Sequence, residues 1–179
     1  KDGTRLGERK GDEPQFDPGV ITEGNKTYLY TGFCGRGDKS RHGSMCTTLG
    51  SDMLTIEEEP VFVVPGIEYA KGTSFEGHSF FEASSIRKIG DVYYFIYSCE
   101  SMRELCYATS KNPRKDFVYG GVLVSNEGGN NHGSIVKIKD SWYVFYHRQT
   151  NGNWYSRQGC AEKIEILPDG SIPQVEMTS

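Results

Sequence analysis

The chain has 179 residues, enough for one domain with a substantial buried core. Its formal net charge of −4 and pI near 5.6 argue against nucleic acid or an anionic membrane as a general partner. No apolar stretch reaches the roughly 20 residues that span a bilayer, and we find no signal peptide in the chain, which opens with a polar segment at Lys1. Aromatic residues (12%) and 22 glycines favour short strands and turns over helices.

Residues 1–15 are charged and lack periodicity, which predicts an extended polar arm. From residue 16 onward, β-rich runs alternate with turn signals such as Glu23-Gly-Asn-Lys, and they group into three units, approximately 16–65, 80–126 and 130–179. The predicted strands are 19–22, 27–33, 42–49 and 60–64, then 83–89, 92–98, 105–110 and 121–125, and finally 134–138, 142–147, 157–166 and 172–177.

About four antiparallel strands per unit, repeated at blade-like intervals, are typical of a β-propeller. The sequence therefore predicts an all-β fold with about three four-stranded blades. A β-sandwich and an open β-solenoid stay open as alternatives.

The three units begin alike, with Asp17-Pro-Gly-Val-Ile, Glu82-Ala-Ser-Ser-Ile and His132-Gly-Ser-Ile-Val. In a propeller the innermost strand of each blade lines the central channel, so its first residues lie near one mouth of that channel. Asp17, Glu82 and His132 should then converge on one funnel. A sandwich makes no such prediction.

Two carboxylates facing one pocket are the minimum equipment for cleaving a glycosidic bond. Glu82 follows two phenylalanines, and an apolar setting raises the pKa of a carboxyl, as a proton donor requires near neutral pH. Plain structural interpretations stay open: Glu82 as a solvent-exposed strand residue, Asp17 as a turn residue before proline, and His132 as a structural histidine.

Five cysteines without CxxC spacing favour buried strand residues in a reducing compartment. A disulfide between Cys99 and Cys106, at the ends of one predicted hairpin, is the alternative. We expect no zinc site, because histidine and cysteine do not occur at zinc-finger spacings. The compartment, cytoplasmic or secreted, stays undecided.

Three motifs in order, Phe16-Asp-Pro-Gly-Val, Phe80-Phe-Glu-Ala-Ser-Ser-Ile-Arg-Lys and Asn130-Asn-His-Gly-Ser-Ile-Val, resemble glycoside hydrolase family 43 from about residue 14 to the end. The third is followed by Trp142-Tyr-Val-Phe-Tyr-His-Arg. The resemblance implies a five-bladed β-propeller. It also implies an inverting enzyme, of the α-L-arabinofuranosidase or β-D-xylosidase type, that acts on arabinose- or xylose-containing plant polysaccharides or oligosaccharides.

The same resemblance implies roles for individual residues. Glu82 matches the general acid, and Asp17 matches the aspartate that raises the pKa of the acid and orients it. His132 matches a histidine that faces a bound calcium ion, usually through water, and it counts among the sugar-binding candidates. Arg157 resembles an arginine that contacts the sugar, with a surface cation at the start of a strand as the alternative. Phe33 and Phe81, together with Phe80, are candidates for apolar walls beside a sugar ring, and core packing stays open as the alternative for all three.

The family's general base, an aspartate on an earlier blade, has no counterpart here. Asp2 and Asp12 lie in the polar arm without a following strand, so neither is a credible base. We therefore expect a fragment of a larger enzyme, whose partner is the missing N-terminal blades or a complementary segment. A non-catalytic carbohydrate-binding propeller and an exo-β-galactanase-like hydrolase are the alternatives.

Overall fold

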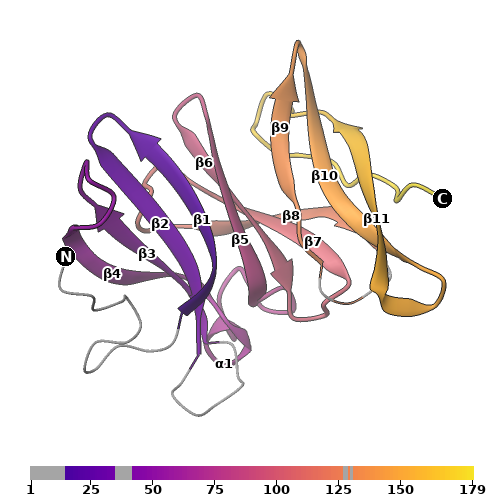
Figure 1. Ribbon diagram of the computed structural model, residues 1–179, viewed down its shortest axis with the longest axis horizontal. Coiled ribbons are helices and arrows are strands. Elements are labelled where there is room, and N and C mark those ends of the chain that lie inside the picture. The colour runs from indigo at the N-terminus through magenta and orange to yellow at the C-terminus, as the bar shows by residue number, and fades with distance from the viewer. Residues whose placement is uncertain (1–14, 35–41, 127–128, 130) are drawn as a thin grey trace.

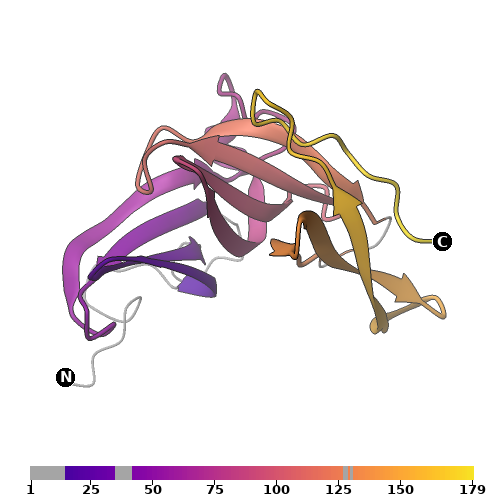
Figure 2. The ribbon, with the colours of Figure 1, turned by 90° about the horizontal axis from the view of Figure 1, so that it is seen from above.

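The computed structural model describes residues 15–34, 42–126, 129 and 131–179, which form three antiparallel sheets and one short helix. The predicted polar arm and Asp2 and Asp12 lie outside the described residues, apart from Gln15. The sheets follow one another in chain order across the molecule (Figure 1) and trace an open arc when seen from above (Figure 2). In the described part of the chain, no helix is long and apolar enough to cross a membrane.

The first two sheets each have four strands in sequential order. The first consists of β1 (Gln15–Glu23), β2 (Lys26–Phe33), β3 (Gly43–Leu49) and β4 (Ile56–Pro65). The helix α1 (Ile67–Ala70) lies in the segment that leads to the second sheet, which consists of β5 (Phe80–Ile89), β6 (Val92–Cys99), β7 (Glu104–Ser110) and β8 (Val118–Ser125). This up-and-down order confirms the predicted all-β, blade-like organisation.

The third sheet departs from the prediction, because it has three strands among the described residues: β9 (Ser134–Ile138), β10 (Ser141–Thr150) and β11 (Asn153–Ile164). The prediction of a fourth strand at 172–177 was wrong. That segment instead crosses back to the second sheet, where Val175 N donates to Leu123 O at 2.9 Å in a single parallel bridge. Its apolar side chains pack into the core between the sheets, and Tyr107 Oη accepts the Ile172 N–H at 2.9 Å.

Strand β6 explains why the middle sheet is buried on both faces. Because side chains alternate along a strand, its residues divide between two hydrophobic cores. Tyr93, Phe95, Tyr97 and Cys99 pack against the first sheet, whereas Tyr94 and Ile96 pack against the third. The near-continuous apolar run of β6 is thus the sequence signature of a central blade rather than of a half-exposed strand.

The first strand of each sheet, β1, β5 and β9, forms an edge of that sheet, and β5 contacts both of the others. Arg87 Nε on β5 donates to Ile135 O on β9 at 2.9 Å. On the other side, Lys88 Nζ lies 2.6 Å from Glu23 Oε1 at the end of β1. The three inner strands therefore lie next to one another, as the propeller prediction requires.

Gly19 allows β1 to approach β5 closely. A Cβ atom at this position would lie 2.6 Å from the carbonyl oxygen of Ser84, which is backbone and cannot rotate away. We expect Gly19→Ala to lower the free energy of unfolding by about 1–3 kcal/mol, because the two strands must separate to accept the methyl group.

Gly159→Ala is the matched control, since nothing lies within 4 Å of the position a Cβ would take there. Denaturant unfolding of both variants measures the difference. Equal stability of Gly19→Ala and wild type would contradict the close packing of β1 on β5.

Candidate active site

Two β-bulges bring the carboxylates of Asp17 and Glu82 to the same place. The β1–β2 register shifts between Phe16 and Gly19, and the β5–β6 register shifts on both sides of Glu82. Asp17 has a φ of 48° and Ala83 a φ of 70°, a left-handed conformation that is uncommon for residues other than glycine. Bulges change the direction of side chains near functional sites, and here each bulge lies near the start of the first strand of its sheet.

His132 completes the cluster from the segment before β9. Its Nε2 lies 3.7 Å from Glu82 Oε1 and 3.8 Å from Asp17 Oδ2. One ligating atom from each of the three residues lies within 4.8 Å of the others. The predicted convergence of Asp17, Glu82 and His132 on one place is therefore present in the structure.

The next residue, Gly133, lets the segment that carries His132 pack closely against Leu105 and Phe145. A Cβ there would lie 2.5 Å from Phe145 O and 2.4 Å from a methyl carbon of Leu105. The lack of a side chain lets the backbone that carries His132 lie against the second and third sheets at once.

The side chains of the cluster differ in exposure. Glu82 is the most buried, with 11% of its side chain exposed, against 34% for Asp17 and 49% for His132. The cluster thus combines one buried carboxylate with a second carboxylate and an imidazole that are both partly exposed to solvent. The Glu82 carboxyl, as the buried member of the cluster, is the group placed to donate or accept a proton.

The carboxylates raise the pKa of His132 above its ordinary value. The largest cause is its hydrogen bond with Glu82, and the charges of Asp17 and Glu82 act in the same direction. Burial and the charge of Arg157 oppose them without cancelling them. The imidazolium form of His132 is thus favoured by two negative neighbours.

Arg157 and His147 approach the same site from the third sheet. Arg157 is exposed, and its Nε donates to Trp154 O at 3.1 Å. Burial lowers the pKa of His147, and the charges of Arg157 and His132 lower it further. His147 was not among the residues we predicted for the site. Its only sequence signal is its place at the end of the aromatic strand that follows the His132 motif.

The aromatic candidates lie in different settings. Phe33 is 6% exposed and packs edge-on against Phe62 and His42, so it belongs to an aromatic cluster of the first sheet. Phe80 is 1% exposed and is a core residue. Phe81 is partly buried and immediately precedes Glu82 in β5.

The donor set does not suit direct coordination of calcium. Calcium prefers six to eight oxygen ligands at about 2.3–2.6 Å. The cluster offers two carboxylates, one of which is hydrogen-bonded to His132, and an imidazole nitrogen, which is a poor calcium ligand. His132 fits only the water-mediated contact that the family resemblance implies.

Most of the cysteines are buried, as expected. All five are free, and four of them, Cys46, Cys99, Cys106 and Cys160, are buried. The alternative disulfide between Cys99 and Cys106 is not formed in the structure.

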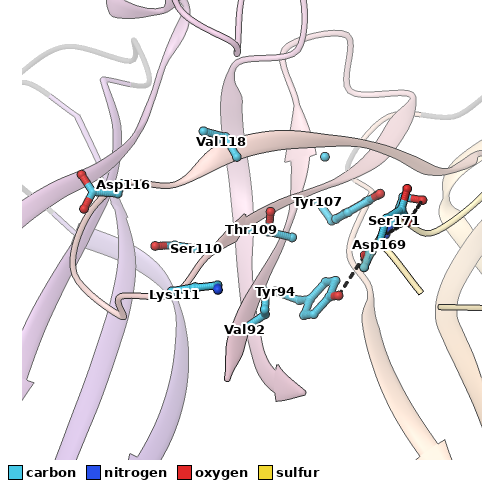
Figure 3. A pocket seen from close by; sticks show the side chains of 12 residues that line it. Val92, Tyr94, Tyr107, Thr109, Ser110, Lys111, Asp116, Val118, Asp169 and Ser171 are labelled. Carbon is cyan, nitrogen blue, oxygen red and sulfur yellow. Dashed lines mark hydrogen bonds between the residues drawn. The ribbon is translucent and has the colours of Figure 1, made fainter. Parts of the chain in front are cut away.

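A separate hollow lies at the other end of the second sheet (Figure 3). It is lined by Tyr94, Tyr107 and the turn at Asp169, and Tyr94 Oη donates to Gly170 O at 2.8 Å. Glu82 pairs with Ser98, near the opposite end of β6 from Tyr94. The hollow is therefore distinct from the carboxylate cluster.

Comparisons with known proteins agree with this picture. A family model described as "Glycosyl hydrolases family 43" matches residues 2–172. A "Xylosidase/arabinosidase" of Thermoclostridium stercorarium is 66% identical over 194 residues, covering 99% of this chain and 41% of that protein. A "Xylosidase/arabinosidase" of Bacteroides ovatus is 32% identical over 157 residues, covering 85% of this chain and 48% of that protein. The chain thus spans less than half the length of these two relatives.

Solved structures show the same fold. A GH43 beta-xylosidase/alpha-arabinofuranosidase from a compost microbial metagenome, in complex with xylotriose and in a calcium-free form, has a TM-score of 0.77 at 25% identity. The match covers 91% of this chain and 58% of that one. A GH43_1 enzyme from Xanthomonas citri has a TM-score of 0.76 at 26% identity, covering 90% and 56%.

These likenesses confirm the β-propeller type of fold and the resemblance that the three motifs indicated. Because the family model extends over nearly the whole chain, the protein belongs to glycosyl hydrolase family 43.

Proposed function

We propose that the protein is an inverting glycoside hydrolase acting on arabinose- or xylose-containing plant polysaccharides or oligosaccharides, with Glu82 as its general acid. The convergence of Asp17 from β1, Glu82 from β5 and His132 from the segment before β9 carries this proposal. The names of the relatives, xylosidase/arabinosidase, support the substrate class.

Glu82 is the proton donor because it is the buried carboxylate. Asp17 presents a second carboxylate within 4.8 Å, and two negative charges so close disfavour each other. We propose that this repulsion helps Glu82 to keep its proton until the sugar is bound, which is the role of Asp17 as the modulator of the acid. Glu82 delivers that proton to the glycosidic oxygen of the leaving group, while Asp17 orients it and helps to retain the proton.

Asp17 is too close to Glu82 to activate water on the opposite face of the sugar. Inverting enzymes separate acid and base by about 6.5–9.5 Å to make room for the water molecule. We therefore propose that the general base comes from polypeptide beyond these 179 residues, consistent with the longer relatives. Additional N-terminal blades, or a complementary segment, would supply it and close the arc.

The candidate sugar-binding residues differ in their exposure and in their position relative to Glu82 and His132. Arg157 is exposed near His132, and Phe81 lies beside Glu82, so these residues are the stronger candidates for holding the substrate. Phe33 is the weaker one, since its ring packs on Phe62 and His42. A calcium contact of His132 through water stays a prediction, and no step of the mechanism depends on it.

Replacing the acid tests the proposal. In the intact protein, Glu82→Gln should lower kcat on xylo- or arabino-oligosaccharides by about 10²–10⁴-fold, because the leaving sugar oxygen then departs without a proton. Aryl glycosides with good leaving groups should lose less. Initial-rate kinetics on both substrate types measure the effect.

Glu57→Gln, an exposed glutamate of β4, is the control and should retain full activity. Unchanged hydrolysis by Glu82→Gln would refute its role as the acid. Tight oligosaccharide binding without any hydrolysis by the intact wild-type protein would favour a carbohydrate-binding propeller instead. Proton NMR of the first product anomer checks inversion.

Asp17→Asn should reduce kcat by about tenfold or more, since loss of the neighbouring charge lets the acid give up its proton to solvent at lower pH. The basic limb of the pH–rate profile should therefore move to lower pH. A profile that keeps its basic limb while the rate falls would show that Asp17 acts through structure alone.

The titration of His132 reports the cluster directly. Its raised pKa means that the favourable interaction of its charged form with the Asp17–Glu82 pair is fully present below about pH 6.5 and is lost as pH rises through the elevated pKa. We expect the pKa of His132, followed by NMR of its imidazole protons, to drop in Glu82→Gln and to rise in Arg157→Ala. No change in either variant would contradict the observed geometry.

A further inference from the structure

A second cluster of ligand-type side chains lies within the blade that carries Glu82. His78, Cys99, Glu104 and Cys106 each bring one ligating atom to within 4.8 Å of the other three. His78 precedes β5, Cys99 ends β6, and the other two lie on β7. No zinc spacing is visible in the sequence, because the residues come from three separate segments.

The separations suit one tetrahedral ion. With metal–ligand bonds of about 2.0–2.3 Å, neighbouring ligand atoms of a tetrahedral zinc site lie about 3.3–3.8 Å apart. Glu104 Oε2 lies 3.3 Å from His78 Nδ1 and 3.3 Å from Cys99 Sγ. A contraction of about 1 Å or less would place all four atoms at bonding distance.

The imidazole of His78 is oriented by its neighbours and has a nitrogen that a metal ion could use, free of hydrogen bonds from the described part of the chain. Its Nδ1 is buried and makes no hydrogen bond within the described residues, although Glu104 is near it. The ring stacks on Tyr119, with centroids 4.7 Å apart and planes inclined by 8°. Tyr97 Oη donates to His78 O at 2.7 Å, which fixes the backbone behind the ring. Such outer contacts orient metal-binding histidines in proteins.

Access and donor chemistry agree with a metal. The two thiols are fully buried, whereas His78 and Glu104 keep 34% and 29% of their side chains exposed and open the cluster to solvent. Two sulfur donors with one nitrogen and one oxygen suit a borderline-soft divalent cation such as Zn²⁺ better than calcium or magnesium.

A disulfide fits the same atoms less well. Cys106 pairs with Tyr97, two residues before Cys99, so the cysteines are diagonal neighbours across β6 and β7. Diagonal Cα atoms lie about 7–8 Å apart, beyond the usual range for a disulfide of about 4.4–6.8 Å.

We propose that His78, Cys99, Glu104 and Cys106 form a structural site for Zn²⁺ that fastens the segment before β5 to the β6–β7 hairpin. Phe80 pairs with Cys99, and Glu82 pairs with Ser98, so the bound ion would brace the strand that carries the carboxylate cluster. The site is separate from that cluster and does not depend on the proposed hydrolysis.

Cobalt(II) is a spectroscopic probe for this site. The intact protein, reduced and freed of metal by a chelator, should bind one equivalent of Co²⁺ with thiolate-to-metal charge-transfer absorption and the visible bands of a tetrahedral ion. Zn²⁺ should displace the Co²⁺ and raise the apparent Tm. Absence of these bands under reducing conditions, or loss of about two mass units through disulfide formation in place of metal uptake, would overturn the proposal.

Variants locate the ion. Cys99→Ser, Cys106→Ser and the shape-conserving Glu104→Gln should each weaken Co²⁺ binding, the two cysteine changes by at least about 100-fold. Cys46→Ser, a buried cysteine of the first sheet, and Glu82→Gln are controls and should bind as wild type does. Circular dichroism confirms that each variant is folded. Binding that survives both cysteine changes, or that is lost in the controls, would contradict the assignment.

Discussion

The contact between β1 and β5 is the constraint on which the site depends. Gly19 lies so close to the backbone of Ser84 that no side chain fits between the strands. The bulges at Asp17 and Ala83 flank this contact and turn the ends of both strands toward the same point. Without the close approach, the two carboxylates would belong to two separate sheets. With the close approach, the carboxylates of Asp17 and Glu82 lie within 4.8 Å of each other and interact electrostatically.

The left-handed backbone at two non-glycine residues has an energetic cost, of the order of 1–2 kcal/mol each. The surrounding structure offsets it. Ala83 is buried, and Phe80 and Ile86 of the same strand sit in the core between the first and second sheets. Strain next to Asp17 and Glu82 is thus held by packing, which is the usual setting for a preorganised site.

The second sheet carries two polar clusters in an otherwise apolar blade. Each is assembled across strands or sheets, from residues far apart in the sequence. The carboxylate cluster lies where side chains from the first sheet, the second sheet and the segment before the third sheet meet. The His78 and cysteine cluster lies within the blade itself, where an ion would join three segments. Burial between two cores gives both clusters a rigid frame.

The sequence by itself determined the strand-rich fold, the repeated unit and the chemically active residue at the start of each of the three units. Period-two alternation, turn residues and the repeated starts are local signals, and they sufficed to predict that Asp17, Glu82 and His132 converge. These local signals gave the wrong structure where contacts between residues distant in the sequence determine the fold. The segment 172–177 has the apolar residues of a strand, yet hydrogen bonds to Leu123 and Tyr107 draw it to another sheet.

Only the tertiary structure decided how those residues meet. Bulge conformations depend on the neighbouring strand, so the left-handed Asp17 and Ala83 carry no sequence signal of the kind that glycine gives. Phe33 looks like a sugar-stacking residue in the sequence, but its ring packs on Phe62 from β4 and on His42, which directly precedes β3. Likewise, His147 near Arg157, and His78 beside two cysteines, result from the pairing of strands, which no spacing along the chain encodes.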